Sequence, residues 1–167
     1  MIRRTSLGIL IGICIIFSSA LISCSKEEPP KSAQQEAKTT EGGRQGLFNA
    51  QIHVDSVPEA AKAGTKLKLP VKVKNTSDEI WPAKGPESVR LSYHWLDAGT
   101  SKSVVWDGKR TFLSKDVAPA EEVVIDAMVE TPPTKGNYIL EFDLVQEKVA
   151  WFGKKGSPTA RFNITVQ

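Results

Sequence analysis

The stretch Gly136-Asn137-Tyr138-Ile139-Leu140-Glu141-Phe142-Asp143-Leu144 decides the fold of this chain. Every second residue from Tyr138 onward is apolar, and two of the residues between them are carboxylates. Because side chains alternate between the two faces of a strand, this spacing predicts one apolar and one polar face. The turn-forming residues 132–136 lead directly into it. We expect the strand to pack its apolar face inward and to expose the other to water.

Six further runs repeat this alternation, and turn-forming residues separate them. Seven short strands at this spacing predict an all-β domain, an immunoglobulin-like β-sandwich that occupies residues 47–167. No helix of useful length is expected there. The six runs are residues 48–54, 67–73, 89–95, 103–106, 123–129 and 160–166.

Two aromatic residues fit this architecture. Trp95 ends the third run, where such sandwiches carry a buried tryptophan. Tyr138 follows a turn, where they carry a corner tyrosine whose hydroxyl bonds back to the chain. We expect both side chains to be packing residues, because large aromatic side chains dominate burial in a core.

The N-terminal residues are predicted to be a lipoprotein leader. Met1-Ile2-Arg3-Arg4 is a positive head, residues 7–22 are largely apolar, and Leu21-Ile22-Ser23-Cys24 closes the run. This is the plan of a secretory signal, and its last four residues resemble the bacterial lipobox. The resemblance implies that residues 1–23 are a cleaved signal peptide and that Cys24 carries the lipid, including acyl chains such as palmitate. The alternative is an uncleaved anchor helix, for which the run is short.

The residue after the lipidation site suggests a destination. Ser25 stands there rather than Asp, and by resemblance to lipoproteins of enteric diderm bacteria this implies the outer membrane, facing the periplasm. The protein would then contact the membrane through its N-terminal lipid. Residues 24–46 lack large apolar side chains and mix charges with Pro, Gly, Ser and Gln. We expect them to form a flexible linker.

Cysteine usage agrees with this plan. The chain has two cysteines: Cys14 would leave with the signal peptide, and Cys24 would be lipidated. No thiol would remain for a disulfide, so packing alone has to hold the predicted sandwich together.

Several stretches of the predicted domain resemble known Ig-like modules. These are Val71-Lys72-Val73-Lys74-Asn75-Thr76-Ser77, Ile80-Trp81-Pro82, Ala118-Pro119-Ala120-Glu121 and Gly136-Asn137-Tyr138-Ile139-Leu140. Together they are similar to the four-tryptophan Ig-like domain of autophagy cargo receptors. They are closer to Ig-like modules attached to bacterial glycosyltransferases and methyltransferases. The resemblance implies an Ig-like fold and brings no enzyme active site with it.

The chain departs from those families at two positions. Leu69 stands where the four-tryptophan family tends to carry Trp, and Ala120 stands where the turn usually carries Gly. The first departure argues against a shared peptide-binding role.

Nothing in the predicted domain points to an enzyme. Its two histidines, His53 and His94, fall on the polar phase of their strands, so both are expected to be solvated or rim residues. Zinc-type His/Cys spacing, a nucleophile elbow and a phosphate loop are all absent. No metal and no cofactor are therefore expected. Basic and acidic residues nearly balance over residues 47–167, which gives no reason to expect nucleic acid as a partner.

One strand has a strongly basic outer face. Lys66, Lys68, Lys72 and Lys74 share the polar phase of the second run. We interpret this face as a protected sheet edge or a solvated surface, since lysine discourages strand-on-strand aggregation. Contact with anionic lipid or lipopolysaccharide phosphate is the alternative.

Aromatic and polar residues near the strand ends are candidates for ligand binding. Exposed aromatic rings beside hydrogen-bonding groups suit the recognition of sugars or peptides. Arg110 could stack on Trp106 or pair with Asp107. The alternative is that the aromatic rings fill the ends of the sandwich. The candidate binding residues are Trp81, Trp106, Asp107, Arg110, Trp151 and Phe152.

These observations lead to two hypotheses about function. The first is a membrane-anchored, non-enzymatic envelope lipoprotein that presents an Ig-like binding or adhesion module to an envelope protein or glycan. The second is a carbohydrate-binding accessory protein in the handling of envelope polysaccharide, with Trp106 and Trp151 as stacking platforms.

Overall fold

The computed structural model describes residues 46–167. The predicted signal peptide 1–23, Cys24 and the linker up to residue 45 lie outside the described residues. Within residues 46–167, no helix is long and apolar enough to cross a membrane.

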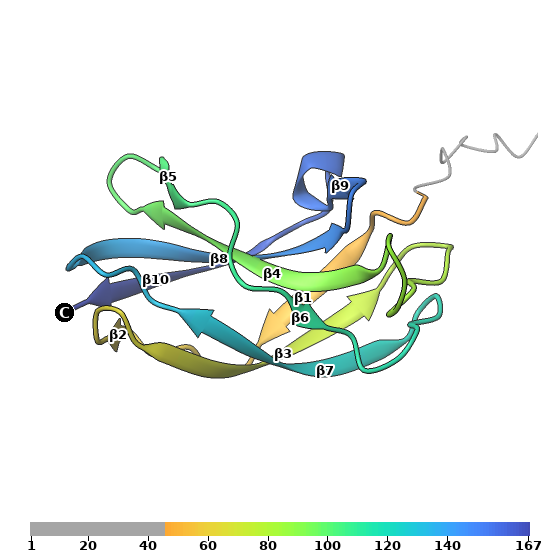
Figure 1. The fold of residues 1–167 in the computed structure, drawn as a ribbon, viewed down its shortest axis with the longest axis horizontal. Coiled ribbons are helices and arrows are strands. Elements are labelled where there is room, and N and C mark those ends of the chain that lie inside the picture. Colours follow the sequence, from red (N-terminus) through yellow and green to blue (C-terminus); the bar gives the residue numbers. More distant parts are fainter. Residues whose placement is uncertain (1–45) are drawn as a thin grey trace, which may run out of the picture. The chain divides into compact units, whose positions relative to one another are not determined.

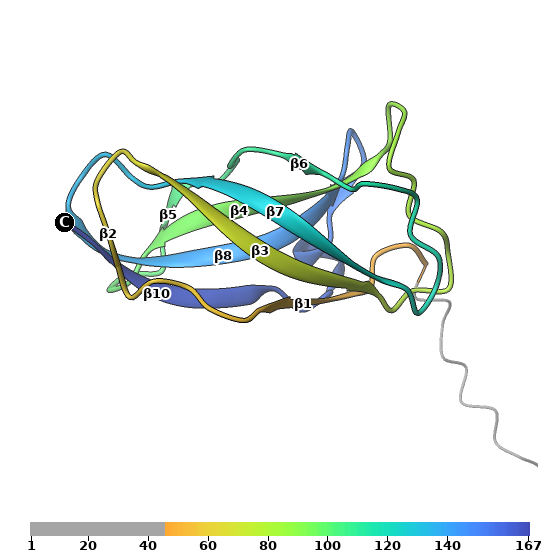
Figure 2. The ribbon, with the colours of Figure 1, turned by 90° about the horizontal axis from the view of Figure 1, so that it is seen from below.

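The described residues form an all-β sandwich of two sheets (Figures 1 and 2). The smaller sheet has the order β1-β3-β7, and the larger has the order β2-β10-β8-β4-β5, with β6 paired to β4 and β9 to β8. Every pairing is antiparallel except the short one between β2 and β10. The elements are β1 Ala50–Val54, β2 Ala60–Ala61, β3 Lys66–Asn75, β4 Val89–Asp97, β5 Ser103–Val105, β6 Thr111–Phe112, β7 Glu122–Glu130, β8 Gly136–Gln146, β9 Ala150–Trp151, the 3₁₀-helix η1 Gly153–Lys155 and β10 Ala160–Val166.

All seven predicted strands are confirmed, as β1, β3, β4, β5, β7, β8 and β10. Three two-residue strands, β2, β6 and β9, were not predicted because two residues are too few to show a period.

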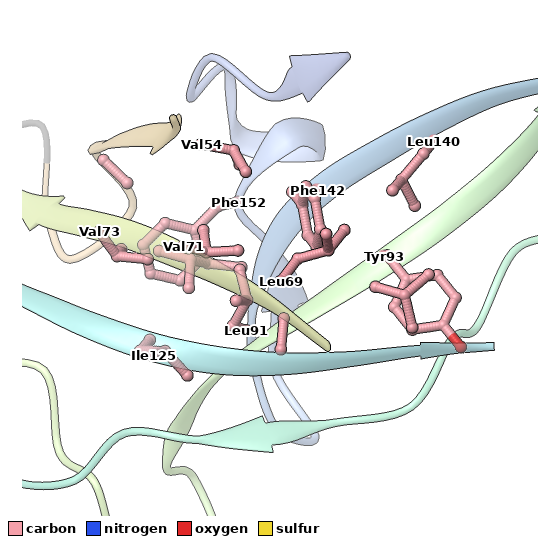
Figure 3. Packing of buried hydrophobic residues seen from close by; sticks show 14 of the residues in the cluster. Val54, Leu69, Val71, Val73, Leu91, Tyr93, Ile125, Leu140, Phe142 and Phe152 are labelled. Atoms are coloured by element: carbon pink, nitrogen blue, oxygen red, sulfur yellow. The ribbon is translucent and has the colours of Figure 1, made fainter. Parts of the chain in front are cut away.

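The core lies between the two sheets, where the apolar phases of their strands meet (Figure 3). Val71 and Ile125 come from the smaller sheet, and Leu91, Leu140 and Phe142 come from the larger one. All five are buried. This is the inward packing that the period of two predicts.

Trp95 and Tyr138 are buried packing residues, as predicted. Trp95 lies on β4, and its Nε1 donates a hydrogen bond of 2.9 Å to the carbonyl of Glu130 on β7, across the sandwich. The hydroxyl of Tyr138 donates one of 3.0 Å to the carbonyl of Thr134. The two rings meet edge to face, with centroids 6.1 Å apart. Both polar tips are thus satisfied inside an apolar environment.

The turn before β7 explains one departure from the Ig-like families. Ala120 adopts a left-handed backbone conformation with φ 65°, which is the conformation that glycine reaches without strain. The Glu121 carboxylate accepts a 2.8 Å hydrogen bond from the backbone N–H of Ala118 and so helps to hold the turn closed. That carboxylate also pairs with Lys115, and the side-chain bond to Lys115 is the main reason why the pKa of Glu121 lies below its usual value.

The lysine-rich strand β3 is not a sheet edge, so that part of the prediction is wrong. It lies between β1 and β7. Its lysines are solvated and meet acids on the neighbouring strands: Lys66 is opposite Glu130 in the register, and Lys68 pairs with Asp126 at 2.9 Å. Lys72 pairs likewise with Asp55. These neighbouring acids reduce the excess positive charge on which the lipid alternative depends.

Candidate functional site: a cleft on the outer face of the larger sheet

The polar phases of β4 and β8 are buried, contrary to the expectation that they face water. The two strands are antiparallel neighbours, with Ser92 opposite Asp143 and His94 opposite Glu141. All four side chains are buried, and His94 is 1% exposed. The prediction that His94 is a solvated or rim residue is therefore wrong, whereas His53 is confirmed as an exposed residue.

Two chain segments cover this face, and they are the physical reason for the error. β5 turns back along β4, and β9 turns back along the end of β8 and continues into η1. Figure 1 shows both segments on the side of the larger sheet that faces away from the smaller sheet. Periodicity reports only the two faces of a strand and cannot show which of them a later segment will cover.

The turn between β4 and β5 is held by Asp97. Its Oδ1 accepts hydrogen bonds from the hydroxyl of Thr100 at 2.7 Å and from the Thr100 backbone N–H at 2.8 Å. These two bonds, the hydroxyl first, hold the pKa of Asp97 below its usual value. The turn in this way fixes the position of β5, which carries one wall of the site.

A cleft of about 460 Å³ lies between the two covering segments. Its volume falls in the range of about 300–1,000 Å³ that is usual for small-molecule sites. Buried polar side chains of β4 and β8 form its floor, the β5 segment forms one wall, and the segment from η1 to β10 forms the other. Its main lining residues are His94, Glu141 and Asp143 on the floor, Ser103 and Trp106 on the first wall, and Lys154, Thr159 and Arg161 on the second.

Trp106 forms the aromatic rim of the cleft and is 41% exposed. One face of its indole stacks on His94, with ring centroids 4.1 Å apart and planes 13° from parallel. The Nζ atom of Lys154 lies 4.9 Å from the centre of the Trp106 ring. Trp151 completes the cluster, with its ring 4.4 Å from His94 and 5.9 Å from Trp106. The histidine thus supports both tryptophans from below.

His94 connects this aromatic cluster to the floor. Its Nδ1 donates a hydrogen bond to the Trp106 carbonyl, which can only accept. Its Nε2 is buried and has no hydrogen-bond partner among the described residues. The Asp143 Oδ2 atom lies 3.7 Å away from it, beyond hydrogen-bond distance. One ring nitrogen of His94 is thus held by the Trp106 carbonyl, and the other is enclosed by the protein.

The two floor carboxylates are held by the second wall. Glu141 Oε1 accepts hydrogen bonds from Thr159 Oγ1 at 2.6 Å and from Arg161 Nε at 2.9 Å. Asp143 Oδ1 accepts one from the Gly153 backbone N–H at 3.0 Å. A Cβ atom at Gly153 would come within 2.9 Å of Asp143 Oδ2. Only glycine therefore lets η1 approach the sheet closely enough to fix this carboxylate.

The structure brings Asp107, Arg110 and Trp151 together beside the cleft. Arg110 Nη1 is 2.5 Å from Asp107 Oδ1, as the sequence suggested, and Arg110 Nε is 2.9 Å from Glu147 Oε1. The guanidinium lies over the ring of Trp151, at 4.8 Å, and not over Trp106 as the alternative had it. Arg110 also donates to Ser92 Oγ at 3.1 Å. Its donors are thus used within the protein, and it braces the aromatic cluster from the side.

Trp81 and Phe152 do not belong to a binding surface. Both are fully buried, and their rings meet edge to face with centroids 5.4 Å apart. The indole Nε1 of Trp81 donates to the Leu47 carbonyl at 2.9 Å. Trp151 ends β9 and contacts His94 and Trp106 on the outer face of the sheet. At Phe152 the chain leaves the strand conformation and turns into η1, and the Phe152 ring enters the core. For these two candidates the alternative of core filling is correct.

Sequence reasoning did not single out Glu141, Lys154 and Arg161 for the site, and it dismissed His94. The sequence did contain one indication of the site. The two central strands, β4 and β8, place polar side chains opposite one another, and each strand is followed by a segment that carries a tryptophan, Trp106 or Trp151. Such large aromatic side chains need a surface to pack against. The contact between those segments is long-range, and no local pattern reveals it.

Within residues 46–167, no group of three or more His, Cys, Asp or Glu side chains is placed to hold a metal ion. The lining of the cleft offers an aromatic surface, hydroxyls, carboxylates and basic groups.

Comparisons with known proteins do not assign this chain to a family. No family model matches it, and no curated protein matches it significantly. Among solved structures, it is similar to the CARDB domain of a Pyrococcus furiosus protein, at 17% identity over 71% of this chain and 92% of that chain, with a TM-score of 0.40. It is also similar to Spo0M, a sporulation control protein of Bacillus subtilis, at 13% identity over 71% of this chain and 49% of that one, with a TM-score of 0.44.

A β-glucosidase of Listeria innocua is a further similar structure, at 13% identity with a TM-score of 0.43. The match covers 71% of this chain but only 16% of that enzyme, just as it covers about half of the Bacillus protein. Likenesses at this level do not extend to function.

Proposed function

We propose that this protein is a lipid-anchored, non-enzymatic binding module of the bacterial cell envelope, and that it binds a glycan in the Trp106 cleft. The single observation that carries the proposal is the exposed Trp106 ring at the rim of a cleft with a buried polar floor. An aromatic ring can stack on the apolar face of a sugar while polar groups bind its hydroxyls.

The shape of the site favours a glycan over a protein partner. Protein interfaces need about 800 Å² from each partner over a broad surface, whereas this site is a concave cleft of about 460 Å³. Its polar atoms are fixed before a ligand arrives, because the floor carboxylates are already hydrogen-bonded to the wall. Pre-organised groups bind with a smaller entropic cost. An adhesion role through a strand edge has no comparable feature to support it.

The arrangement of His94 supports binding rather than catalysis. A general base must reach the proton that it removes. His94 Nδ1 is committed to the Trp106 carbonyl, and its Nε2 is shielded from solvent. The imidazole is therefore a structural support for the tryptophan, and we assign no catalytic residue.

The anchor is the lipobox Leu21-Ile22-Ser23-Cys24. With Cys24 lipidated, residues 24–46 would connect the sandwich to the membrane. We place the protein at the outer membrane, facing the periplasm, where envelope glycans are within its reach.

The anchor predicts lipid labelling that depends on one residue. Wild-type protein from cells grown with radiolabelled palmitate should carry the label, and globomycin should block cleavage of its signal peptide. Cys24→Ser should abolish the label, because the thiol that accepts diacylglyceryl is gone, while Cys14→Ser should be labelled normally. Label retained in Cys24→Ser would overturn the lipid anchor and leave the cleft proposal untouched.

The cleft predicts glycan binding that depends on Trp106. On a glycan array, the soluble domain 47–167 should bind a subset of envelope glycans, and Trp106→Ala should weaken that binding about tenfold, since ring stacking of this kind is worth ~1 kcal/mol or more. The matched control is Phe112→Ala, which removes another exposed aromatic ring, on β6 and outside the cleft. Equal binding by wild type and Trp106→Ala, or no binding to any glycan, would contradict the proposal.

A further inference from the structure

We infer that the Trp106 cleft selects a neutral glycan, roughly one or two sugar rings in extent, against acidic and amino-substituted forms of the same sugar. This inference rests on the proposed function and adds the chemical class of the ligand. It follows from the charges on the walls and floor, the lysine contact on the Trp106 ring and the carboxylate acceptors on the floor.

The charged groups that line the cleft balance. Glu141 and Asp143 are the two acids, and Lys154 and Arg161 are the two bases. An ionised ligand is bound well only where the site offers opposite charge in excess, because a charge that leaves water without a partner costs much free energy. A cleft without net charge therefore gives no advantage to a carboxylate, a phosphate or an ammonium group.

Two of these charges, Arg161 and Glu141, are already paired with each other within the protein. Arg161 Nη2 lies 2.9 Å from Glu141 Oε1, and Thr159 adds a hydroxyl to the same oxygen. Asp143 is held by the Gly153 backbone N–H. An acidic ligand would have to compete with Glu141 for Arg161, and an amine would have to compete with Arg161 for Glu141. A sugar hydroxyl competes with neither, because it can add a hydrogen bond to the lone pairs and protons that remain.

The rim fits the apolar face of a neutral ring. Lys154 is exposed and reaches the Trp106 ring through a flexible side chain, with its Nζ 4.9 Å from the ring centre. Such a contact at an exposed site is worth only about 0.5–1 kcal/mol. A sugar ring can displace the ammonium from the indole, and the ammonium can then donate to a sugar hydroxyl. The other face of Trp106 is fixed by His94.

The floor carboxylates favour a ligand that can donate hydrogen bonds. Glu141 and Asp143 both line the cleft, and their oxygens are acceptors. Hydroxyl groups are both donors and acceptors, so a polyhydroxylated ligand complements this floor better than an anion, which only accepts.

The test is an array of matched disaccharide triplets on glucose, galactose and mannose backbones, in which the same position carries a hydroxymethyl, a carboxylate or an aminomethyl group. We expect wild-type protein to bind the neutral member of at least one triplet about tenfold or more tightly than the other two. Preference for the uronic acid or the amino sugar would overturn this inference while leaving glycan binding intact. Binding to no member, together with an empty general glycan array, would remove the proposed function as well.

Two substitutions shift the charge of the cleft in opposite directions. Asp143→Asn leaves a net positive cleft and should move the ratio of uronic-acid to neutral binding upward roughly tenfold. Lys154→Gln leaves a net negative cleft and should move the ratio of amino-sugar to neutral binding upward by a similar factor. The matched control is Lys155→Gln, which removes the neighbouring exposed lysine that lies over Phe48 instead of the cleft.

Lys154→Gln keeps the test decisive if Asp143→Asn does not fold, because Lys154 is an exposed residue of η1. Ratios that do not change in Lys154→Gln, or that change as much in Lys155→Gln, would show that the charge balance of the cleft does not set its selectivity.

Discussion

Replacement of Trp95 by alanine is expected to lower the free energy of unfolding of the domain by about 3–5 kcal/mol. Trp95 is 0% exposed, so its removal leaves a cavity in the centre of the sandwich. The substitution also leaves the Glu130 carbonyl without the indole Nε1 donor at 2.9 Å, and Tyr138 without its edge-to-face partner. A domain without a disulfide has no covalent link to compensate for this loss.

Urea denaturation of residues 47–167, followed by circular dichroism, measures this effect. Total stabilities of small domains are about 5–15 kcal/mol, so the variant should be only marginally folded at room temperature. Trp106→Ala is the matched control: it removes the same side chain from a half-exposed position and should cost much less. A Trp95→Ala curve that coincides with wild type would show that Trp95 does not hold the core together.

Replacement of Asn75 by alanine is expected to cost about 2–4 kcal/mol, because its fully buried amide makes four hydrogen bonds. Nδ2 donates to the carbonyls of Glu79 at 2.8 Å and Val117 at 2.9 Å. Oδ1 accepts from the backbone N–H of Ser77 at 2.9 Å and from its hydroxyl at 2.7 Å. The side chain thus ties the end of β3 to the loop that follows it and to the chain that leads into β7.

Thermal unfolding of Asn75→Ala against Asn163→Ala provides the measurement. Asn163 is an exposed residue of β10, so its substitution should change the free energy of unfolding by no more than about 0.5 kcal/mol. The buried groups that bond to Asn75 cannot all find other partners, which is why its loss is expensive. Equal melting temperatures for the two variants would refute the assigned role of Asn75.

Trp95 also connects the stability of the domain to the candidate site. Trp95 and His94 are neighbours on β4 and lie on opposite faces of it. Packing around Trp95 fixes the position of the strand, and the strand fixes His94 beneath Trp106. A loosened core would therefore weaken ligand binding indirectly, so binding by core variants has to be compared at equal folded fraction.

Much of the fold could be predicted because its signals are local. The alternation from Tyr138 to Leu144 requires only neighbouring residues to be read, and it appears in the structure as β8. The burial of Trp95 and Tyr138 could be predicted because the strand that holds each of them is recognisable from neighbouring residues. Asn75 was noticed only as part of a resemblance, and the structure shows that its amide organises the loop.

The candidate site could be predicted only in part. Trp106, Asp107, Arg110 and Trp151 do come together, since each follows a central strand of the same sheet. Trp81 and Phe152 were equally aromatic and equally close to turns, yet the pairing of Trp81 with Val117 and the turn from β9 into η1 at Phe152 bury them. Nothing in the local sequence separates the two groups.

By itself, the sequence determined the all-β class, the approximate bounds of seven strands and the inward faces of those strands, because alternation along a strand depends on residue spacing alone. Only the tertiary structure decided that β3 is central, and that the β5 and β9–η1 segments cover the polar face of β4 and β8. Those decisions depend on contacts between residues far apart in the chain. Because these segments cover the face, His94, Glu141 and Asp143 form the floor of a cleft instead of the solvated surface that the sequence predicts.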